Sequence, residues 1–389
     1  MPDGSRWSGS RLDADIIIVG GGCAGLSLAA RLAERPGQAG RVLITEQRSH
    51  YYDDRTFSFW GPVPPLFHRS VRASWTSWCV QSGARRIERS HPETAYHSLR
   101  SEDFYRASLA AIARDPDFEI RHGITAGHVG EDDESAVLQT AHGRLRAGLI
   151  IDTRPLPPSP AAHGLLQLFT GAEIETPAPC FNDAAAELMV FDPPNPRFIG
   201  FTYVLPFTPT RALIEYTRFA ADPIDMPGEA DLLPRLQARA PSGYTVQRRE
   251  AGALTMRVDA PPRAAGRRIL SMGTLAGAAR ASTGYAFAGI QAQATSLAAR
   301  VCQGWQAASG WRPDPPPVWL REMDRIFLRV LRQNPAAGPA LFIDLFEHCP
   351  PDRLVRFLSG AAGIGEALDV VRALPVAPFI RHGLLGVRA

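Results

Sequence analysis

The chain has 389 residues, of which 45% are hydrophobic and 21% are charged, and its formal net charge is +3. This composition is typical of a globular protein with room for more than one domain, and it excludes disordered and fibrous classes. Every basic residue other than histidine is arginine, which excludes lysine Schiff-base chemistry and a phosphate-loop lysine. The small net charge gives no support for a nucleic-acid partner.

Five cysteines lie far apart in the sequence, without a C-x-x-C pair. This odd, scattered set predicts a reducing compartment and argues against a disulfide framework or a zinc site. No H-E-x-x-H spacing occurs either, so we expect no metal. The first twelve residues do not form a secretion signal, and no apolar run approaches the ~18 residues that cross a bilayer. We therefore expect a cytoplasmic protein, with contact to a membrane surface left open.

A glycine-rich turn follows the first apolar strand, Asp15–Val19. Gly20 is expected to make the tight turn, Gly22 to let the backbone approach a pyrophosphate, and Gly25 to pack a helix against the strand. A second strand ends at Glu46, 21 residues after Gly25, where a carboxylate binds the ribose hydroxyls of adenosine. The segment therefore predicts a Rossmann-type unit that binds an adenine dinucleotide.

A lone glycine motif would be weak evidence, because most glycine-rich turns are only turns. Here all the expected parts follow in the expected order: the strand, the glycines, a helix that stops at Pro36, and the acidic residue. The motif begins within twenty residues of the N-terminus, which is more typical of flavoproteins. FAD is therefore favoured over a nicotinamide.

The later segments show two kinds of sequence pattern. A helix is predicted over 101–114, buried strands over 149–152 and 268–273, and a helix over 289–301. Between them, residues 165–256 form short alternating strands separated by Pro, Gly and Asp. This pattern predicts an antiparallel sheet inserted into a discontinuous nucleotide-binding domain.

Several segments in this order resemble the bacterial lycopene β-cyclases, a family of carotenoid-forming flavoproteins. They are Asp54–Trp60, Tyr203–Phe207 with Ala212–Thr217, Ala281–Phe287, Arg356–Gly360 and Leu374–Phe379. Each segment is modest by itself, but together they are specific, and the resemblance extends from residue 15 to about residue 380.

The predicted fold is α/β, with a Rossmann-type FAD-binding domain of the aromatic-hydroxylase type, an inserted antiparallel β-sheet substrate domain and a C-terminal helical region. The FAD-binding domain is assigned to residues 13–70, 99–160 and 265–305. The β domain is assigned to residues 71–98 and 161–264, and the helical region to residues 306–389.

The resemblance implies a redox-neutral reaction on an acyclic carotenoid, lycopene. The ψ-end is protonated, the resulting cation is attacked by a nearby double bond, and a proton is lost to leave a β-ionone ring, giving γ-carotene and β-carotene. The family uses FAD in its reduced form, with NAD(P)H as the reductant, directly or through an electron-donating reductase. Because the substrate is insoluble, we expect peripheral membrane attachment, carried by arginine-flanked apolar helices near the C-terminus.

Glu215 is the candidate acid. It follows Leu213 and Ile214 in a strand-like segment, where burial would keep a carboxyl group protonated near neutral pH. It also occupies the glutamate position of the family's acidic motif. The alternative is a strand-edge glutamate that faces water, which composition alone favours.

Other site residues follow from the same resemblance. The turn at Gly273 and Thr274 lies where many FAD enzymes of this fold carry Gly-Asp, and this departure weakens a hydroxylase interpretation. Thr283 and Gly284 are expected to approach the isoalloxazine edge, and Arg55 is counted with the cofactor-binding residues. Aromatic faces can attract a carbocation, and the candidates, at least half of which we expect to be ordinary core, are Phe57, Phe59, Trp60, Tyr203, Phe207, Tyr285 and Phe287.

Two alternatives share the expected fold. One is an FAD-dependent monooxygenase of the aromatic-hydroxylase type, which would consume oxygen. The other is a prenyl-lipid carrier that no longer holds FAD, which the intact glycines and Glu46 disfavour.

Overall fold

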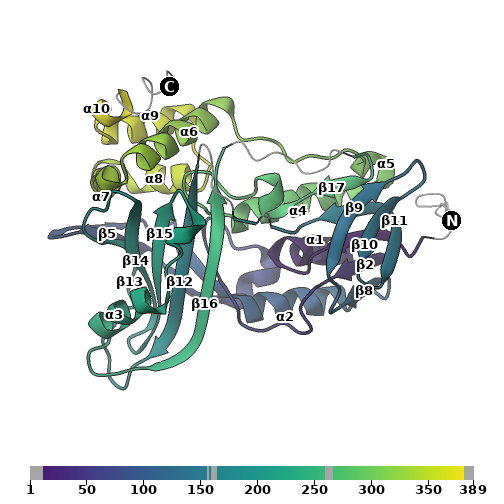
Figure 1. Ribbon diagram of the computed structural model, residues 1–389, viewed down its shortest axis with the longest axis horizontal. Coiled ribbons are helices and arrows are strands. Elements are labelled where there is room, and N and C mark those ends of the chain that lie inside the picture. The colour runs from purple at the N-terminus through teal and green to yellow at the C-terminus, as the bar shows by residue number, and fades with distance from the viewer. Residues whose placement is uncertain (1–11, 156, 159–163, 259–265, 381–389) are drawn as a thin grey trace.

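The computed structural model describes residues 12–155, 157–158, 164–258 and 266–380 (Figure 1). In these residues the chain forms two large β-sheets, a small third sheet and a group of C-terminal helices. In the view of Figure 1 the sheet that carries the glycine motif lies on the right, the second large sheet on the left, and the C-terminal helices above the second sheet. The predicted fold class is confirmed.

The first sheet has the strand order β8-β2-β1-β11-β10-β9, and β17 also pairs with β11. The pairs between β8, β2, β1, β11 and β17 are parallel, whereas β9 and β10 are added in antiparallel fashion. Parallel strands are covered on both faces, which explains the unbroken apolar sequence of β1. The strands are β1 (Ala14–Val19), β2 (Val42–Thr45), β8 (Phe118–Arg121), β9 (Ala126–Glu131), β10 (Ala136–Thr140), β11 (Gly143–Asp152) and β17 (Ile269–Ser271).

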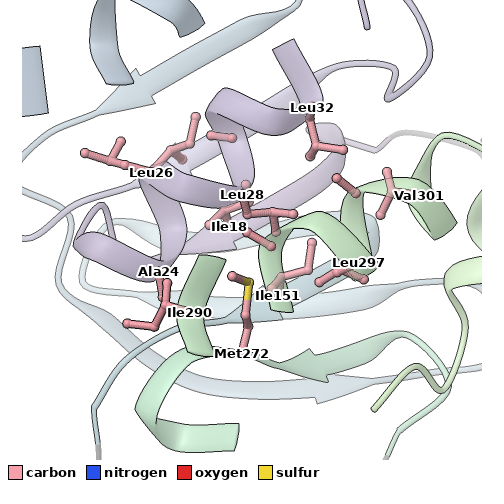
Figure 2. Close-up of a cluster of buried hydrophobic side chains, with 14 of the residues drawn as sticks. Ile18, Ala24, Leu26, Leu28, Leu32, Ile151, Met272, Ile290, Leu297 and Val301 are labelled. Carbon is pink, nitrogen blue, oxygen red and sulfur yellow. The ribbon is translucent and has the colours of Figure 1, made fainter. Parts of the chain in front are cut away.

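Two helices distant in sequence pack together over this sheet. Helix α1 (Cys23–Ala33) follows β1 directly, and α4 (Phe287–Val301) comes from the later part of the chain. Figure 2 shows their buried side chains meeting, among them Leu28 of α1 and Leu297 of α4. The first-sheet unit is therefore closed by two separate stretches of sequence. Helix α2 (Ser101–Ile112) packs against α1.

The second sheet has the order β16-β12-β15-β14-β13-β5-β6. Its neighbouring strands are antiparallel, as expected, except that β5 and β13 pair in parallel. Helix α3 (Glu229–Arg239) covers one face, where Leu232 and Leu236 pack against Ile214. The strands are β5 (Ser77–Ser82), β6 (Arg85–Ser90), β12 (Leu165–Glu175), β13 (Ala185–Phe191), β14 (Phe198–Thr208), β15 (Arg211–Ala220) and β16 (Thr245–Met256).

A three-stranded sheet lies in the order β3-β7-β4. Its strands are β3 (Thr56–Trp60), β4 (Val71–Trp75) and β7 (Tyr96–Arg100). Because β7 runs directly into α2, and β4 and β5 are separated by one residue, this small sheet connects the two large ones.

The C-terminal region is helical, as predicted. Its longer helices are α6 (Val318–Gln333), α7 (Gly338–His348), α8 (Pro351–Leu358) and α9 (Ile364–Ala373), with the short helices α5 (Trp305–Ala308) and α10 (Val376–Pro378). The apolar face of α6 is packed inside the protein, where Leu320, Leu328 and Leu331 are buried. No helix within the described residues is both long and apolar enough to span a bilayer.

Candidate functional site

The glycine-rich turn leaves the backbone at the start of α1 accessible to a ligand. Gly20 has φ +102°, a conformation that a residue with a side chain rarely adopts. A Cβ added at Gly22 would meet nothing within 4 Å, so the backbone there can be approached closely. Gly22 caps α1 without a side-chain hydrogen bond, which leaves the first N–H groups of the helix available to an anion. These features fit a pyrophosphate group.

Glu46 is buried at the end of β2, beside this turn. Its carboxylate accepts hydrogen bonds from the Gly21 N–H at 2.9 Å and from the backbone N–H of Arg48 at 2.8 Å. Burial alone would raise the pKa of Glu46, but the hydrogen bonds and charge of Arg48 hold it below its ordinary value. The hydroxyl group of Tyr51 is buried near Gly21 and has no hydrogen-bond partner among the described residues. An ionised carboxylate and an unpartnered hydroxyl thus lie together where a ribose is expected.

The Gly273–Thr274 turn lies against the same region. Gly273 has φ +78°, and a Cβ there would come within 2.7 Å of the Ala24 side chain in the first turn of α1. The Gly273 N–H donates to Oε1 of Gln293 at 2.8 Å. The structure therefore brings the turn at 273–274 next to the glycine motif at the start of α1.

The other predicted cofactor residues lie at the junction with the second sheet. Thr283 donates from Oγ1 to the Leu358 carbonyl at 3.2 Å, and Gly284 packs against Gln167 of β12. The half-exposed Arg55 lies close to Gly252 of β16. The predicted cofactor residues thus form two groups, one at the glycine motif and one at the domain junction.

We predict that Gly25→Ala destabilises the protein and lowers its FAD content. A Cβ at Gly25 would overlap the Gly20 carbonyl oxygen, so α1 would have to move away from β1. We expect a cost of roughly 1–3 kcal/mol for this overpacking. Thermal denaturation and the flavin absorbance of the purified protein measure the two effects. Gly365→Ala, at an exposed position of α9 with open space around its Cβ position and no positive φ, is the control and should retain both stability and FAD; equal FAD content in both variants would contradict the prediction.

A row of four residues crosses the second sheet on one face. The register places Tyr203 of β14 opposite Glu215 of β15, Glu215 opposite Gly171 of β12, and Gly171 opposite Glu250 of β16. Residues directly opposite in a sheet project to the same side. The row therefore places two carboxyl groups on one face, separated only by a residue without a side chain.

Glu215 is buried, with 8% of its surface exposed. Burial raises the pKa of Glu215 well above its ordinary value, and the neighbouring negative charge of Glu250 raises it further. The Thr217 hydroxyl donates to Glu215 Oε1 at 2.8 Å. The side chain therefore does not face water as a strand-edge residue would, and its surroundings favour the neutral, proton-carrying form over the carboxylate.

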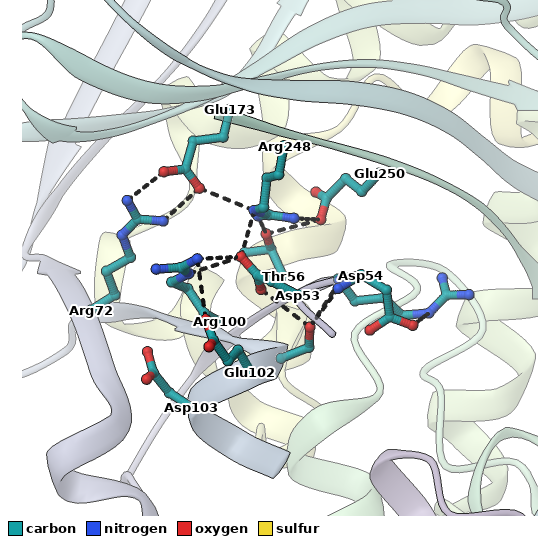
Figure 3. A network of polar contacts seen from close by, with 12 residues as sticks. Asp53, Asp54, Thr56, Arg72, Arg100, Glu102, Asp103, Glu173, Arg248 and Glu250 are labelled. Atoms are coloured by element: carbon teal, nitrogen blue, oxygen red, sulfur yellow. Dashed lines mark hydrogen bonds and ion pairs between the residues drawn. The ribbon is translucent and has the colours of Figure 1, made fainter. Parts of the chain in front are cut away.

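Arginines and carboxylates form a network beside this row (Figure 3). Glu173 is fully buried and receives two hydrogen bonds from Arg72, both at 2.6 Å, one from Arg211 at 2.5 Å and one from Arg248 at 3.0 Å. Arg248 also binds the Glu250 carboxylate at 2.7 Å. The network joins β4, β12, β15 and β16, and so fixes the small sheet against the second sheet.

The aromatic candidates separate into two groups. Phe57 and Phe287 belong to an aromatic core under the first sheet, where both contact Phe104 and where Phe59 stacks on Phe287 at 4.5 Å between ring centroids. Trp60, Tyr203 and Tyr285 instead gather around Tyr96, whose hydroxyl accepts a hydrogen bond from Tyr203 at 2.9 Å. Phe207 lies apart from both, under the guanidinium of Arg72. Only the group around Tyr96 adjoins Glu215, through Tyr203.

Two cavities lie near these residues. One, of about 230 Å³, is a partly open cavity lined mainly by apolar side chains of α6 to α10, including Phe327, Phe342 and Val371. The other, of about 670 Å³, is lined in part by Trp60 and Tyr285. Glu215 lines neither of them, and the tyrosine group lies between it and the larger cavity.

Sequence reasoning missed Glu250, Glu173 and Arg248. The sequence predicts only short alternating strands over 165–256, whereas Glu250 lies within β16, a single strand of twelve residues. Alternation of side chains along the strand beyond Arg248 could have shown that the strand continues through Glu250. The position of Glu250 beside Glu215 could not be predicted from the sequence, because it depends on the register of three strands.

Comparisons with known proteins agree with this architecture. Residues 15–383 match the family model described as lycopene cyclase protein. The chain is also 30% identical over 390 residues to lycopene beta-cyclase from Paracoccus sp. (strain N81106 / MBIC 01143), covering 94% of this chain and 95% of that protein.

Solved structures share the fold at low identity. A geranylgeranyl bacteriochlorophyll reductase-like protein from Thermoplasma acidophilum has a TM-score of 0.61 and 13% identity, covering 95% of this chain and 98% of that one. The p-nitrophenol 4-monooxygenase from Pseudomonas putida DLL-E4 has a TM-score of 0.58 and 16% identity, covering 94% and 98%. Aklavinone-11 hydroxylase, solved with FAD and aklavinone, has a TM-score of 0.54 and 17% identity, covering 76% and 63%. The fold is that of FAD-dependent hydroxylases and reductases, and by its match to the family model and its 30% identical relative the chain belongs to the lycopene cyclase family.

Proposed function

We propose that the protein is a lycopene β-cyclase, which closes the ψ-ends of lycopene into β-ionone rings by acid catalysis without net redox change. The observation that carries the proposal is the buried Glu215, whose raised pKa keeps a transferable proton beside an aromatic group. Membership of the lycopene cyclase family supplies the substrate class.

In this proposal Glu215 donates its proton to the terminal double bond of the polyene. Burial excludes water, which would otherwise quench the resulting tertiary cation. Tyr203, Trp60 and Tyr285 present π faces that attract the developing positive charge. Their grouping around Tyr96 makes them the favoured substrate residues, and we propose that Phe57 and Phe287 act indirectly, by supporting the first-sheet core.

FAD is the proposed cofactor, held at Gly20, Gly22, Gly25, Glu46, and Gly273 with Thr274, with Arg55, Thr283 and Gly284 toward its flavin end. When bound in its reduced form, FAD supplies an electron-rich surface that stabilises a nearby cation. NAD(P)H, or an electron-donating reductase that uses it, is the proposed reductant. The structure with FAD of aklavinone-11 hydroxylase, a protein of the same fold, supports this choice.

We propose that the FAD-binding domain comprises residues 13–70, 99–160 and 265–305, the substrate domain residues 71–98 and 161–264, and the helical region residues 306–389. The first group supplies the strands and helices around the glycine motif, and the second supplies Glu215.

Expression in cells that accumulate lycopene tests the function. We expect the red acyclic carotene to be replaced by yellow-orange cyclic products of identical mass. The purified enzyme should need reduced flavin but should show no NADPH-dependent oxygen uptake coupled to product formation. Unchanged lycopene would reject the proposal, and stoichiometric oxygen consumption would favour a monooxygenase instead.

Peripheral membrane attachment is proposed through the C-terminal helices, with the protein on the cytoplasmic side. The sequence predicts attachment through apolar helices near the C-terminus, but the apolar face of the longest of them, α6, is buried. Exposed apolar side chains instead gather on α9 and around α10, near the smaller apolar cavity. Five of them are 47% to 63% exposed: Ile364, Leu368, Val371, Val376 and Ile380.

We predict that Ile364→Asp combined with Leu368→Asp weakens binding to liposomes by at least about tenfold. Each replaced side chain would lose about 1.5–3 kcal/mol of burial in the lipid interface. Co-sedimentation with anionic liposomes at low salt measures the effect. Ile224→Asp, at a similarly exposed apolar residue outside the C-terminal helices, is the control and should leave binding unchanged. Equal binding by both variants would place the membrane contact elsewhere.

A further inference from the structure

Glu215 and Glu250 lie in one row of the second sheet, on either side of Gly171. Both are buried, with 8% and 6% of their surfaces exposed. A Cβ at Gly171 would lie 3.2 Å from both Cβ and Cγ of Glu215, so a larger residue would occupy the space between the two carboxyl groups. The glycine therefore allows the two acids to face each other across one strand.

The surroundings of the two acids are unequal. Glu250 Oε2 accepts hydrogen bonds from Arg248 at 2.7 Å and from the Thr56 hydroxyl at 3.0 Å. Glu215 accepts one, from the neutral Thr217 hydroxyl at 2.8 Å. A guanidinium at hydrogen-bond distance favours a carboxylate, whereas two buried carboxylates at close range cannot both remain ionised. The charge therefore resides on Glu250 and the proton on Glu215.

We propose that Glu250 is a positioning residue that holds the acid proton on Glu215, so that the two side chains form a pair sharing one proton, anchored by Arg248 and Thr56. The proposal rests on the proposed role of Glu215 as the acid. A hydrogen bond between the two carboxyl groups and the charge of Glu250 both raise the pKa of Glu215, in addition to the effect of burial. Such unequal pairs are a general means of keeping one acid protonated and its neighbour charged.

The pair also balances the protons of the reaction. On transfer, the O–H bond of Glu215 breaks and the π electrons of the terminal double bond form a C–H bond on its less substituted carbon, which leaves a tertiary cation on the other carbon and two adjacent carboxylates. Ring closure then releases one proton from carbon, whose bonding electrons form the ring double bond, and the pair takes up one proton. Repulsion between the two carboxylates favours this uptake. The enzyme is thus restored without any oxidant or reductant being consumed.

Glu250→Gln tests the pair through the pH profile of cyclisation. Activity requires protonated Glu215, so it falls as pH rises through the pKa of that residue. The titratable and charged groups that act on Glu215 are Tyr203 on β14 and Arg248 and Glu250 on β16. Removing the negative charge of Glu250 while Arg248 remains lowers the pKa of Glu215. We expect this descending limb to move at least one pH unit lower, so that the variant is about tenfold less active at pH values above the pKa of Glu215 in both forms and recovers its activity at lower pH.

Two further variants separate this effect from a loss of structure. Glu250→Asp retains the charge, so its limb should stay close to that of the wild type even if its maximal rate falls. Glu187→Gln makes the same chemical change in the same sheet, at a residue paired with Arg86 and Arg239, and should leave the profile unchanged. An unshifted limb in Glu250→Gln, or the same shift in all three variants, would overturn the proposal.

A direct measurement does not require activity. Infrared spectroscopy detects the band of a protonated carboxyl group. A band that is present in the wild type at neutral pH and absent in Glu215→Gln would report the proton on Glu215. The pH at which this band disappears should fall by at least one unit in Glu250→Gln. Absence of the band from the wild type would overturn the pair even if Glu250→Gln failed to fold. The expected band and shift without cyclisation of lycopene would uphold the pair and reject the proposed function.

Discussion

We expect Glu215→Gln to abolish ring formation while leaving the fold and the bound flavin intact. The amide has nearly the shape of the protonated acid but cannot deliver a proton to a polyene. General acids contribute roughly 10²–10⁴-fold to rate, so we expect a loss of at least that order. Conversion of lycopene by the purified, flavin-loaded enzyme under reducing conditions measures the effect.

We expect this variant to fold because Glu215 is proposed to be neutral in the wild type. Burial raises the pKa of Glu215, which favours the uncharged acid, so the substitution would remove no ion pair. The melting temperature and flavin absorbance should therefore match those of the wild type. Glu187→Gln is the matched control and should cyclise normally. Normal activity in Glu215→Gln with flavin bound would remove Glu215 from the mechanism.

Features that depend on neighbouring residues could be predicted from the sequence. The turn at Gly20, the close packing at Gly25 and the position of Glu46 follow from a spacing that works in one local geometry. Burial of Glu215 followed from its apolar neighbours Leu213 and Ile214, because a strand that is apolar on both faces is covered on both.

Features that depend on strand register or on tertiary packing could not be predicted from the sequence. Glu250 lies 35 positions after Glu215, and only the pairing of β15 and β16 with β12 brings the two acids into one row. Likewise, the sequence identifies Phe57, Phe287 and Tyr203 equally as aromatic candidates and does not distinguish between them. Their placement in a separate core follows from α4 packing over the first sheet, which alternation and composition do not encode.

Helix α6 shows that the sequence also does not reveal what covers the apolar face of a helix. Its apolar residues recur at helical spacing, and this pattern is shared by a helix that binds a membrane and a helix that packs on a core. The structure buries that face, whereas the shorter α9 leaves Ile364 and Leu368 exposed. Sequence periodicity establishes that a helix has an apolar face, but the partner of that face is decided by the rest of the fold.

Glu173→Gln should destabilise the protein by roughly 3–5 kcal/mol, the cost of breaking a buried ion pair from one side. The glutamate is fully buried and is the common partner of Arg72, Arg211 and Arg248. Without its charge, three guanidinium groups face one another in a site that water enters poorly. Chemical denaturation measures the change. Glu119→Gln, which removes an exposed pair with Arg121, is the control and should cost no more than about 1 kcal/mol.

The same network predicts how the wild type responds to acid. Burial opposes ionisation of Glu173, but the hydrogen bonds and charges of Arg72 and Arg211 prevail and lower its pKa from 4.5 to about 2. A carboxylate whose pKa is lower in the folded state stabilises the fold above its unfolded pKa. This contribution, about 3 kcal/mol, is therefore complete above about pH 5 and is lost as pH falls toward 2. The stability difference between wild type and Glu173→Gln should shrink over this range, because protonated Glu173 and glutamine are both neutral; a difference that stays constant with pH would show that the arginines do not hold Glu173 as a carboxylate.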